Sequence, residues 1–101
     1  MKRIMKRDGK IVGFNPNKIR NAIEQAMLSS GEGNHIYAKK VTPTVVEQLN
    51  KEFRDEVPHI EDVQDAVEVS LMKLSLFKTA KSYILYRDQQ RRIREKKKRP
   101  N

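Results

Sequence analysis

Residues 4–16 read IMKRDGKIVGFNP, and they contain the strongest local structural signals of the chain. Two short runs of β type flank Asp8-Gly9, and an Asp-Gly pair in this position is typical of a β-hairpin. A two-residue type I′ turn, which needs positive φ at both central residues, would place Met5 opposite Val12. An isolated hairpin is only marginally stable in water, so we expect the rest of the chain to cover it.

The residues after the hairpin predict a helix that starts at Asn15-Pro16 and stops at Gly31. Asn15 can accept hydrogen bonds from the free amide groups of a helix start, and Pro16 suits the first helical position. A glycine is the residue most often found just past a helix end. The apolar residues in between recur at helical spacing, and they are Ile19, Ala22, Ile23, Ala26 and Met27.

A second helical region is predicted from about residue 36 to residue 53, where apolar residues keep an approximately helical period. Pro43 lies inside it and would either kink the helix or start a new one after Thr42. One continuous region is the favoured interpretation.

Residues 57–60 are expected to be short and extended, because the residue before Pro58 avoids the helical region. This segment could add a third strand to the hairpin. A third helix is predicted to open at Glu61 and Asp62, whose charges oppose the positive end of the helix dipole. A last helix is predicted from about Phe77 into the basic C-terminal residues.

These elements indicate an α+β fold: a four-helix bundle capped by a short three-stranded β-sheet, formed by the N-terminal hairpin plus one short strand. A chain of 101 residues has the size of a single domain. We place the domain at residues 1–92 and interpret residues 93–101 as a basic tail or linker, because they have almost nothing further to bury.

The composition excludes several classes of site. The chain has no cysteine, which excludes disulfides, Cys-based zinc sites and thiol nucleophiles. His35 and His59 alone make a poor set of metal ligands. No apolar run approaches the roughly 18 residues that a membrane span needs, and the N-terminal residues lack the apolar region of a secretory signal. We therefore expect a cytoplasmic protein with no membrane partner.

The net charge of +9 is concentrated at the two ends of the chain. Residues 1–20 contain seven Lys or Arg and one Asp, and residues 87–101 contain eight Lys or Arg and two acidic residues. The residues between them carry seven basic and ten acidic side chains, a net charge of −3. If the fold brings the two ends together, they form a cationic patch suited to a polyphosphate or a nucleic acid; otherwise they are two solvated basic tails.

Three blocks of the sequence, in this order and spacing, resemble the ATP-cone. Residues 6–9 (KRDG) with residues 14–20 (FNPNKIR) look like the N-terminal half of its pattern. Residues 60–68 (IEDVQDAVE) look like its middle block, and residues 80–87 (AKSYILYR) look like its C-terminal signature. Each block alone fits an ordinary solvated edge or helix face, but together they cover nearly the whole chain.

The resemblance implies four helices with a short three-stranded sheet, as the residues themselves indicate. It also implies a regulatory domain without catalysis of its own, of the kind found mostly at the N-terminus of ribonucleotide reductases. Such domains bind ATP or dATP as effector, alone or with Mg²⁺, and report their balance to the catalytic part of the reductase. Because dATP drives those enzymes into an inhibited oligomer, a nucleotide-dependent homo-oligomer is expected. The middle and last blocks look closest to the anaerobic and other non-aerobic reductases.

The resemblance further implies a nucleotide site. By position in the matching blocks, its residues would be Ile4, Lys6, Arg7, Asn15, Lys18, Gln64, Tyr86 and Arg87. Ile4 and the hairpin backbone would line the adenine pocket, and Asn15 would face the base. Lys6, Arg7 and Lys18 would contact the phosphates. Gln64, Tyr86 and Arg87 would close the site from the other side. Val12 stands where some relatives carry a glutamate, and Asn15 where an acid is common, so phosphate binding is the firmer part of this prediction.

The charges of the chain agree with that assignment. A triphosphate needs several Lys or Arg side chains and backbone amides to replace its water. The helix starts at Asn15 and Glu61 could both supply amides, but Glu61 and Asp62 would oppose an anion placed directly beside them. We therefore place the phosphates near the hairpin and the first helix.

Two other functions fit parts of the sequence. A basic nucleic-acid-binding module, or a nucleotide-responsive transcription regulator, would account for the net charge, but no recognition motif is present. A nucleotide hydrolase would need an activated nucleophile or a general-base pair, and none stands out. Asp62 and Asp65 could hold a metal in principle, although their spacing is that of a solvated helix face.

Overall fold

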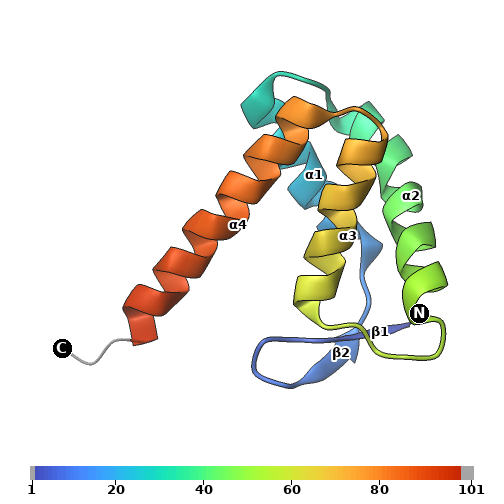
Figure 1. The fold of residues 1–101 in the computed structure, drawn as a ribbon, viewed down its shortest axis with the longest axis vertical. Coiled ribbons are helices and arrows are strands. Elements are labelled where there is room, and N and C mark those ends of the chain that lie inside the picture. Colours follow the sequence, from blue (N-terminus) through green and yellow to red (C-terminus); the bar gives the residue numbers. More distant parts are fainter. Residues whose placement is uncertain (1, 99–101) are drawn as a thin grey trace.

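The computed structural model describes residues 2–98, and within them a β-hairpin lies across one end of four helices (Figure 1). The elements in chain order are β1 (Arg3–Met5), β2 (Ile11–Gly13), α1 (Pro16–Ser30), α2 (His35–Phe53), α3 (Ile60–Lys73) and α4 (Phe77–Lys98). None of these helices is both long enough and apolar enough to span a membrane. The predicted α+β class with four helices is confirmed for the described residues.

The hairpin has a different turn from the one predicted. Ile4 lies opposite Val12, so the expected pairing of Met5 with Val12 is wrong by one residue. The Lys6 amide donates to the Lys10 carbonyl at 2.8 Å, and the Gly9 amide donates back to the Lys6 carbonyl at 3.0 Å. The loop therefore has three residues, of which only Gly9 has positive φ, at 88°. A three-residue loop needs one left-handed residue rather than the two of a type I′ turn.

The predicted third strand is also wrong. Only a single parallel bridge joins Met5 to His59 within the described residues, with the Met5 amide donating to the Pro58 carbonyl at 2.9 Å. Pro58 has no amide hydrogen to extend a ladder. His59 instead caps α3: its Nδ1 accepts from the Glu61 amide at 3.0 Å, and its own amide donates to the Asp62 carboxylate at 2.9 Å. The His59 amide is therefore used by the cap of α3 and is not available to extend a β-strand.

Helix α1 begins and ends as predicted. Asn15 is its N-cap, with the side-chain oxygen accepting from the Asn17 amide at 3.0 Å, and Pro16 occupies the first helical position. Gly31 ends the helix with φ of 73°, and its amide donates to the Met27 carbonyl at 2.9 Å. These contacts satisfy backbone groups that a helix end leaves unpaired.

Helix α2 is continuous through Pro43, as favoured from the sequence. The buried Thr42 hydroxyl donates to the Ala38 carbonyl at 2.8 Å just before the proline. The core lies between the helices, because α1 packs against α2 and α4, and α3 packs against the same two helices. The largest fully buried side chains include Ile23, Met27, Leu49 and Leu71. All the predicted core residues of α1 are buried or pack against this core.

Helix α4 has two unlike halves. Its start is capped from the α1–α2 loop, where the Glu32 carboxylate accepts from the Thr79 amide at 2.7 Å and the Lys78 amide at 3.3 Å. These bonds, the one from Thr79 foremost, hold the pKa of Glu32 below its ordinary value. The first half buries Ala80 and Tyr83, whereas the second half leaves the bundle (Figure 1).

The predicted basic tail, residues 93–101, is helical as far as Lys98. Its last three residues, 99–101, lie outside the described part of the chain. The domain boundary after residue 92 stays a prediction.

Candidate functional site

A cavity of about 560 Å³ lies where the hairpin meets the first turns of α1 and α3. Its floor is apolar and is formed by Ile4, Val12, Phe14, Ile19, Ile60 and Val63. Its rim carries the polar side chains Lys6, Arg7, Asp8, Asn15 and Lys18. A volume of several hundred Å³ with an apolar floor and a few convergent polar groups is typical of a small-molecule site.

The hairpin register places three of these side chains on one face. Successive residues of a strand point to opposite faces, so Ile4 and Lys6 share a face with Val12, which lies opposite Ile4. Asn15 ends the hairpin and caps α1, and Lys18 follows in the first turn of that helix. The corrected register thus carries an apolar strand face and a cation into the same cavity.

Lys6 and Lys18 are exposed on the rim, and neither side chain has a hydrogen bond or ion pair to any residue within 2–98. Their ammonium groups are free to meet an anion that enters the cavity. An ammonium group is a compact, strongly hydrated point charge and a common ligand for phosphate.

Arg7 is engaged, in contrast to the two lysines. Its guanidinium forms an ion pair with Glu61 and donates to the Gln64 side-chain oxygen at 3.2 Å, and 31% of its side chain is exposed. Burial lowers the pKa of Arg7, and repulsion from Arg94 and Arg87 lowers it further. The two basic ends of the sequence therefore do meet, at the edge of this cavity.

Arg87 is held more completely than Arg7, with 18% of its side chain exposed. It forms ion pairs with Glu68, with Glu61 at 2.7 Å and with Asp65 at 3.1 Å. Burial alone would lower its pKa, but the hydrogen bonds to Glu68 and Asp65 outweigh burial, so the pKa of Arg87 is raised. This arginine is a structural link between α3 and α4.

Gln64 joins the two arginines. Its side-chain oxygen accepts from Arg7 at 3.2 Å and from the Arg87 Nε at 3.1 Å. Gln64 and Arg87 do not line the cavity of the hairpin; they line a groove of about 230 Å³ between α3 and α4. Gln64 is connected to the cavity by its hydrogen bond to Arg7, and Arg87 is connected to it through Gln64.

Tyr86 lies apart from the other predicted residues. It is 54% exposed and lines a hollow of about 660 Å³ between α1 and α4. Lys18 belongs to both this hollow and the hairpin cavity. Five of the eight predicted site residues therefore line one cavity, namely Ile4, Lys6, Arg7, Asn15 and Lys18. Gln64 and Arg87 are linked to that cavity by hydrogen bonds that lead to Arg7. Tyr86 lines the neighbouring hollow, which shares Lys18 with the cavity.

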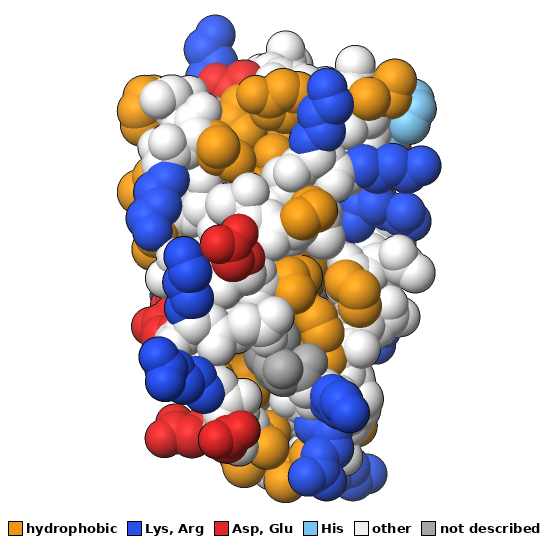
Figure 2. All heavy atoms as spheres, turned by 90° about the vertical axis from the view of Figure 1, so that its right-hand side faces the viewer, with side chains coloured by type: hydrophobic (Ala, Val, Ile, Leu, Met, Phe, Trp, Pro, Cys, Tyr) orange, Lys and Arg blue, Asp and Glu red, His pale blue; other side chains and the backbone are white. Residues whose placement is uncertain are grey.

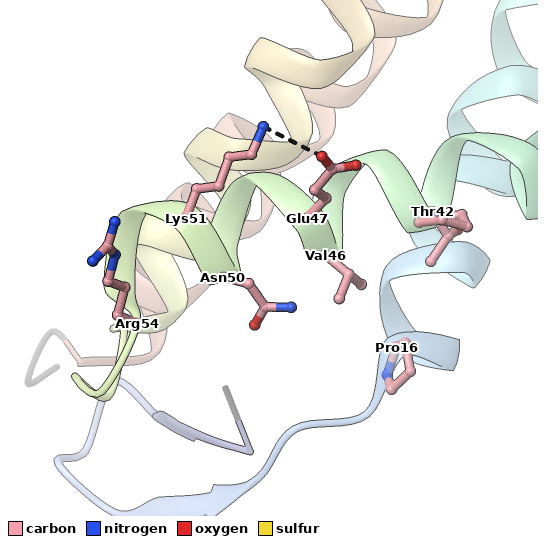
Figure 3. A pocket seen from close by; sticks show the side chains of 8 residues that line it. Pro16, Thr42, Val46, Glu47, Asn50, Lys51 and Arg54 are labelled. Carbon is pink, nitrogen blue, oxygen red and sulfur yellow. Dashed lines mark ion pairs between the residues drawn. The ribbon is translucent and has the colours of Figure 1, made fainter.

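A further hollow of about 600 Å³ lies along α2 (Figure 3). Its Lys51 is paired with Glu47 at 3.3 Å, and Arg54 lies at the far end from Pro16. The side chains drawn in Figure 3 do not converge on a common point. On the face seen in Figure 2, basic side chains are spread along both edges with hydrophobic side chains between them. The cavity beside the hairpin remains the best candidate site.

The sequence predicted Ile4 in the apolar floor, but it did not predict the other floor residues from α1 and α3 or the acidic partners of Arg87. Phe14, Ile60 and Val63 line this floor but are not among the predicted site residues. A signal for the acidic partners was present, because Glu61, Asp65 and Glu68 are spaced four and three residues apart and so share one helix face.

The lining of the cavity has the chemistry of a binding site. Within residues 2–98, no group of three or more His, Cys, Asp or Glu side chains is arranged to hold a metal ion. The cavity combines an apolar floor with cationic side chains, which suits a ligand that has a flat organic part and an anionic part.

Comparison with known proteins agrees with these features. The model of the family described as "ATP cone domain" matches residues 2–92. The chain is 42% identical over 102 residues to the vitamin B12-dependent ribonucleoside-diphosphate reductase of Thermoplasma acidophilum, an alignment that covers 96% of the chain and 13% of that protein. It is 37% identical over 98 residues to the anaerobic ribonucleoside-triphosphate reductase of Salmonella typhimurium, covering 97% of the chain and 13% of that protein.

A third relative is the ribonucleoside-diphosphate reductase subunit alpha of Chlamydia pneumoniae, which is 34% identical over 101 residues, with 93% of the chain and 10% of that protein covered. The chain therefore spans only 10–13% of the length of these relatives. The similarity is not confined to the anaerobic type that the sequence blocks suggested.

Proposed function

Because this chain belongs to the ATP cone domain family, whose members are regulatory domains that sense nucleotides, we propose that the cavity beside its hairpin binds ATP or dATP. The observation that carries the proposal is the pair of free lysines, Lys6 and Lys18, at the rim of an apolar floor. A polyphosphate needs cations that are not already neutralised, and an adenine ring needs apolar surface.

The proposed contacts follow the two parts of the cavity. Ile4 and Phe14 line the base, and Asn15 faces its polar edge. Lys6, Lys18 and Arg7 receive the phosphates. The described residues form no metal cluster of their own, so a Mg²⁺ ion would enter with the phosphate chain, as Mg²⁺ commonly does.

The remaining predicted residues have indirect roles in this proposal. Gln64 of α3 holds Arg7 in place, and Arg87 of α4 holds Gln64 through the same side-chain oxygen. Tyr86 lies in the neighbouring hollow, which Lys18 also lines, and makes only an indirect contribution to nucleotide binding.

We further propose that the effector controls a ribonucleotide reductase, as the names of the relatives suggest, and that the chain acts in the cytoplasm. In this proposal the domain supplies regulation, and the chemistry belongs to the catalytic part of the reductase. Nucleotide binding would act by changing how the domain associates with itself or with that catalytic part.

Calorimetric titration with ATP, dATP and GTP, with the mass in solution measured for each complex, tests this function. We expect adenine nucleotides to bind more tightly than GTP, and the mass to depend on which nucleotide is bound. Equal affinity for all three nucleotides would reduce the cavity to a general phosphate binder. Absence of binding by ATP and dATP alike would disprove the proposal.

A further inference from the structure

Glu61 connects the candidate cavity to α4. One oxygen of its carboxylate contacts Arg7 on the cavity rim, and the other contacts the Arg87 guanidinium at 2.7 Å. Since Arg7 belongs to the hairpin loop and Arg87 to α4, one side chain at the start of α3 touches two separate parts of the molecule.

The two ion pairs of Glu61 differ in how easily they separate. In the pair with Arg7, the side chains are 31% and 47% exposed, so water can solvate both charges when they part. Arg87 is 18% exposed and keeps Glu68 and Asp65 as further partners. Exposed pairs contribute little to stability, whereas separating a largely buried pair leaves a charge without solvent. Of the two ion pairs of Glu61, the one with Arg7 is therefore the easier to break.

An anion in the cavity would compete for Arg7. A phosphate group forms bidentate hydrogen bonds with a guanidinium and carries more negative charge than a carboxylate. Glu61 would repel the same phosphate if it stayed in place.

Building on the proposed function, we propose that Glu61 is a positioning residue that competes with the phosphate chain for Arg7 and, once displaced, pairs only with the arginines of α4. Glu61 thus lowers the affinity for the effector and transmits its presence to α4.

The surroundings of Glu61 support the second half of this proposal. The groove between α3 and α4 is lined by Glu61 together with Arg87, Arg91 and Arg94. Arg94 and Arg87 already repel Arg7, which helps to lower its pKa. An anion that neutralises Arg7 removes this repulsion, so Arg94 can approach the released carboxylate. The second half of α4, which leaves the bundle in Figure 1, would then be drawn towards α3.

The test compares Glu61→Gln with a matched control, Glu47→Gln. Both changes remove one negative charge and keep the side-chain size, but Glu47 pairs with Lys51 on α2, away from the cavity. ATP affinity is measured by calorimetry at one salt concentration. Amide hydrogen exchange across residues 84–98 is measured with and without saturating ATP, because this readout would not respond to a purely structural role of Glu61.

We expect Glu61→Gln to bind ATP about fivefold more tightly than the unchanged chain, a modest coupling between two sites. Glu47→Gln should stay within about twofold, as expected for a distant surface charge. ATP should slow exchange in residues 84–98 of the unchanged chain and of the control, and this effect should be absent from Glu61→Gln.

Unchanged or weaker ATP binding by Glu61→Gln overturns the inference, and so does an effect of ATP on α4 that persists in that variant. The titration of the unchanged chain separates this failure from a failure of the proposed function. If that chain binds no ATP, the proposed function falls and the inference falls with it. If that chain binds ATP and Glu61→Gln lacks either expected change, only the inference falls.

Discussion

The cations beside the hairpin and the cation between α3 and α4 have opposite surroundings. The side chains of Lys6 and Lys18 are exposed and have no hydrogen-bond or ion-pair partner among the described residues. Arg87 is mostly buried and is surrounded by three carboxylates and Gln64. Both kinds of residue belong to basic segments that look alike in the sequence. A basic residue therefore indicates an anion site only where the fold leaves its charge unpaired.

The largest effect in this comparison is expected from Arg87→Ala. Without the guanidinium, Glu61, Asp65 and Glu68 repel one another along one face of α3. We expect the free energy of unfolding to fall by about 2 kcal/mol, less than for a fully buried pair because Asp65 is 65% exposed. Urea denaturation measures the change. Arg92→Ala is the control, since Arg92 is 74% exposed and, within the described part of the chain, pairs only with Asp88. A loss no larger than that of the control would contradict the structural role of Arg87.

Replacing either free lysine should affect ATP binding rather than stability. Lys6→Ala and Lys18→Ala should each weaken ATP binding by more than tenfold, about 1.4 kcal/mol in binding free energy, while leaving the domain folded. The reason is that each removes a charge that only the ligand neutralises. Calorimetry measures the affinity, with Lys51→Ala as the control on α2. Unchanged affinity in both variants would show that the site lies elsewhere.

The hairpin turn offers a smaller test of how the rim is held. Gly9 has φ of 88°, which a residue with a Cβ adopts only with strain, so Gly9→Ala should reduce stability by about 1 kcal/mol. Thermal unfolding measures the loss. Gly13→Ala is a matched control, because Gly13 lacks positive φ and its added Cβ would meet open space. Equal losses in the two variants would mean that the left-handed turn is not the cause.

The smallest effect is expected from Tyr86→Ala. Tyr86 lies in the hollow between α1 and α4 and is separated from the hairpin cavity by Lys18. We expect ATP affinity to fall by less than about threefold, which corresponds to well under 1 kcal/mol. The same titration used for the lysines measures it. A loss as large as that of Lys18→Ala would place the nucleotide in both hollows and remove the contrast between them.

The helices could be predicted because their signals are local. Asn15 and Gly31 mark the ends of α1 through contacts with residues at most four positions away. The turn could not be predicted as safely, because Asp8-Gly9 is compatible with a loop of two or of three residues. The choice depends on which strand face must cover the helices, and that is a property of the whole fold.

The candidate site also has a part that could be predicted from local sequence and a part that could not. Ile4, Lys6, Arg7, Asn15 and Lys18 come from one short stretch, so the hairpin and the first turn of α1 bring them together. The pairing of Arg7 and Arg87 with Glu61 joins residues 54 and 26 positions apart. Neither composition nor the family pattern indicated which cations would be neutralised.

The helices, the two ends of α1 and the cavity residues near the N-terminus could be predicted from the sequence, since each depends on interactions between residues close along the chain. The family could be recognised from the same sequence blocks. Only the tertiary structure decided the hairpin register, the loss of the third strand and the division between free lysines and paired arginines. These outcomes depend on which side chains meet when α3, α4 and the hairpin pack together, and Coulomb interactions of this kind act over distances in space rather than along the chain.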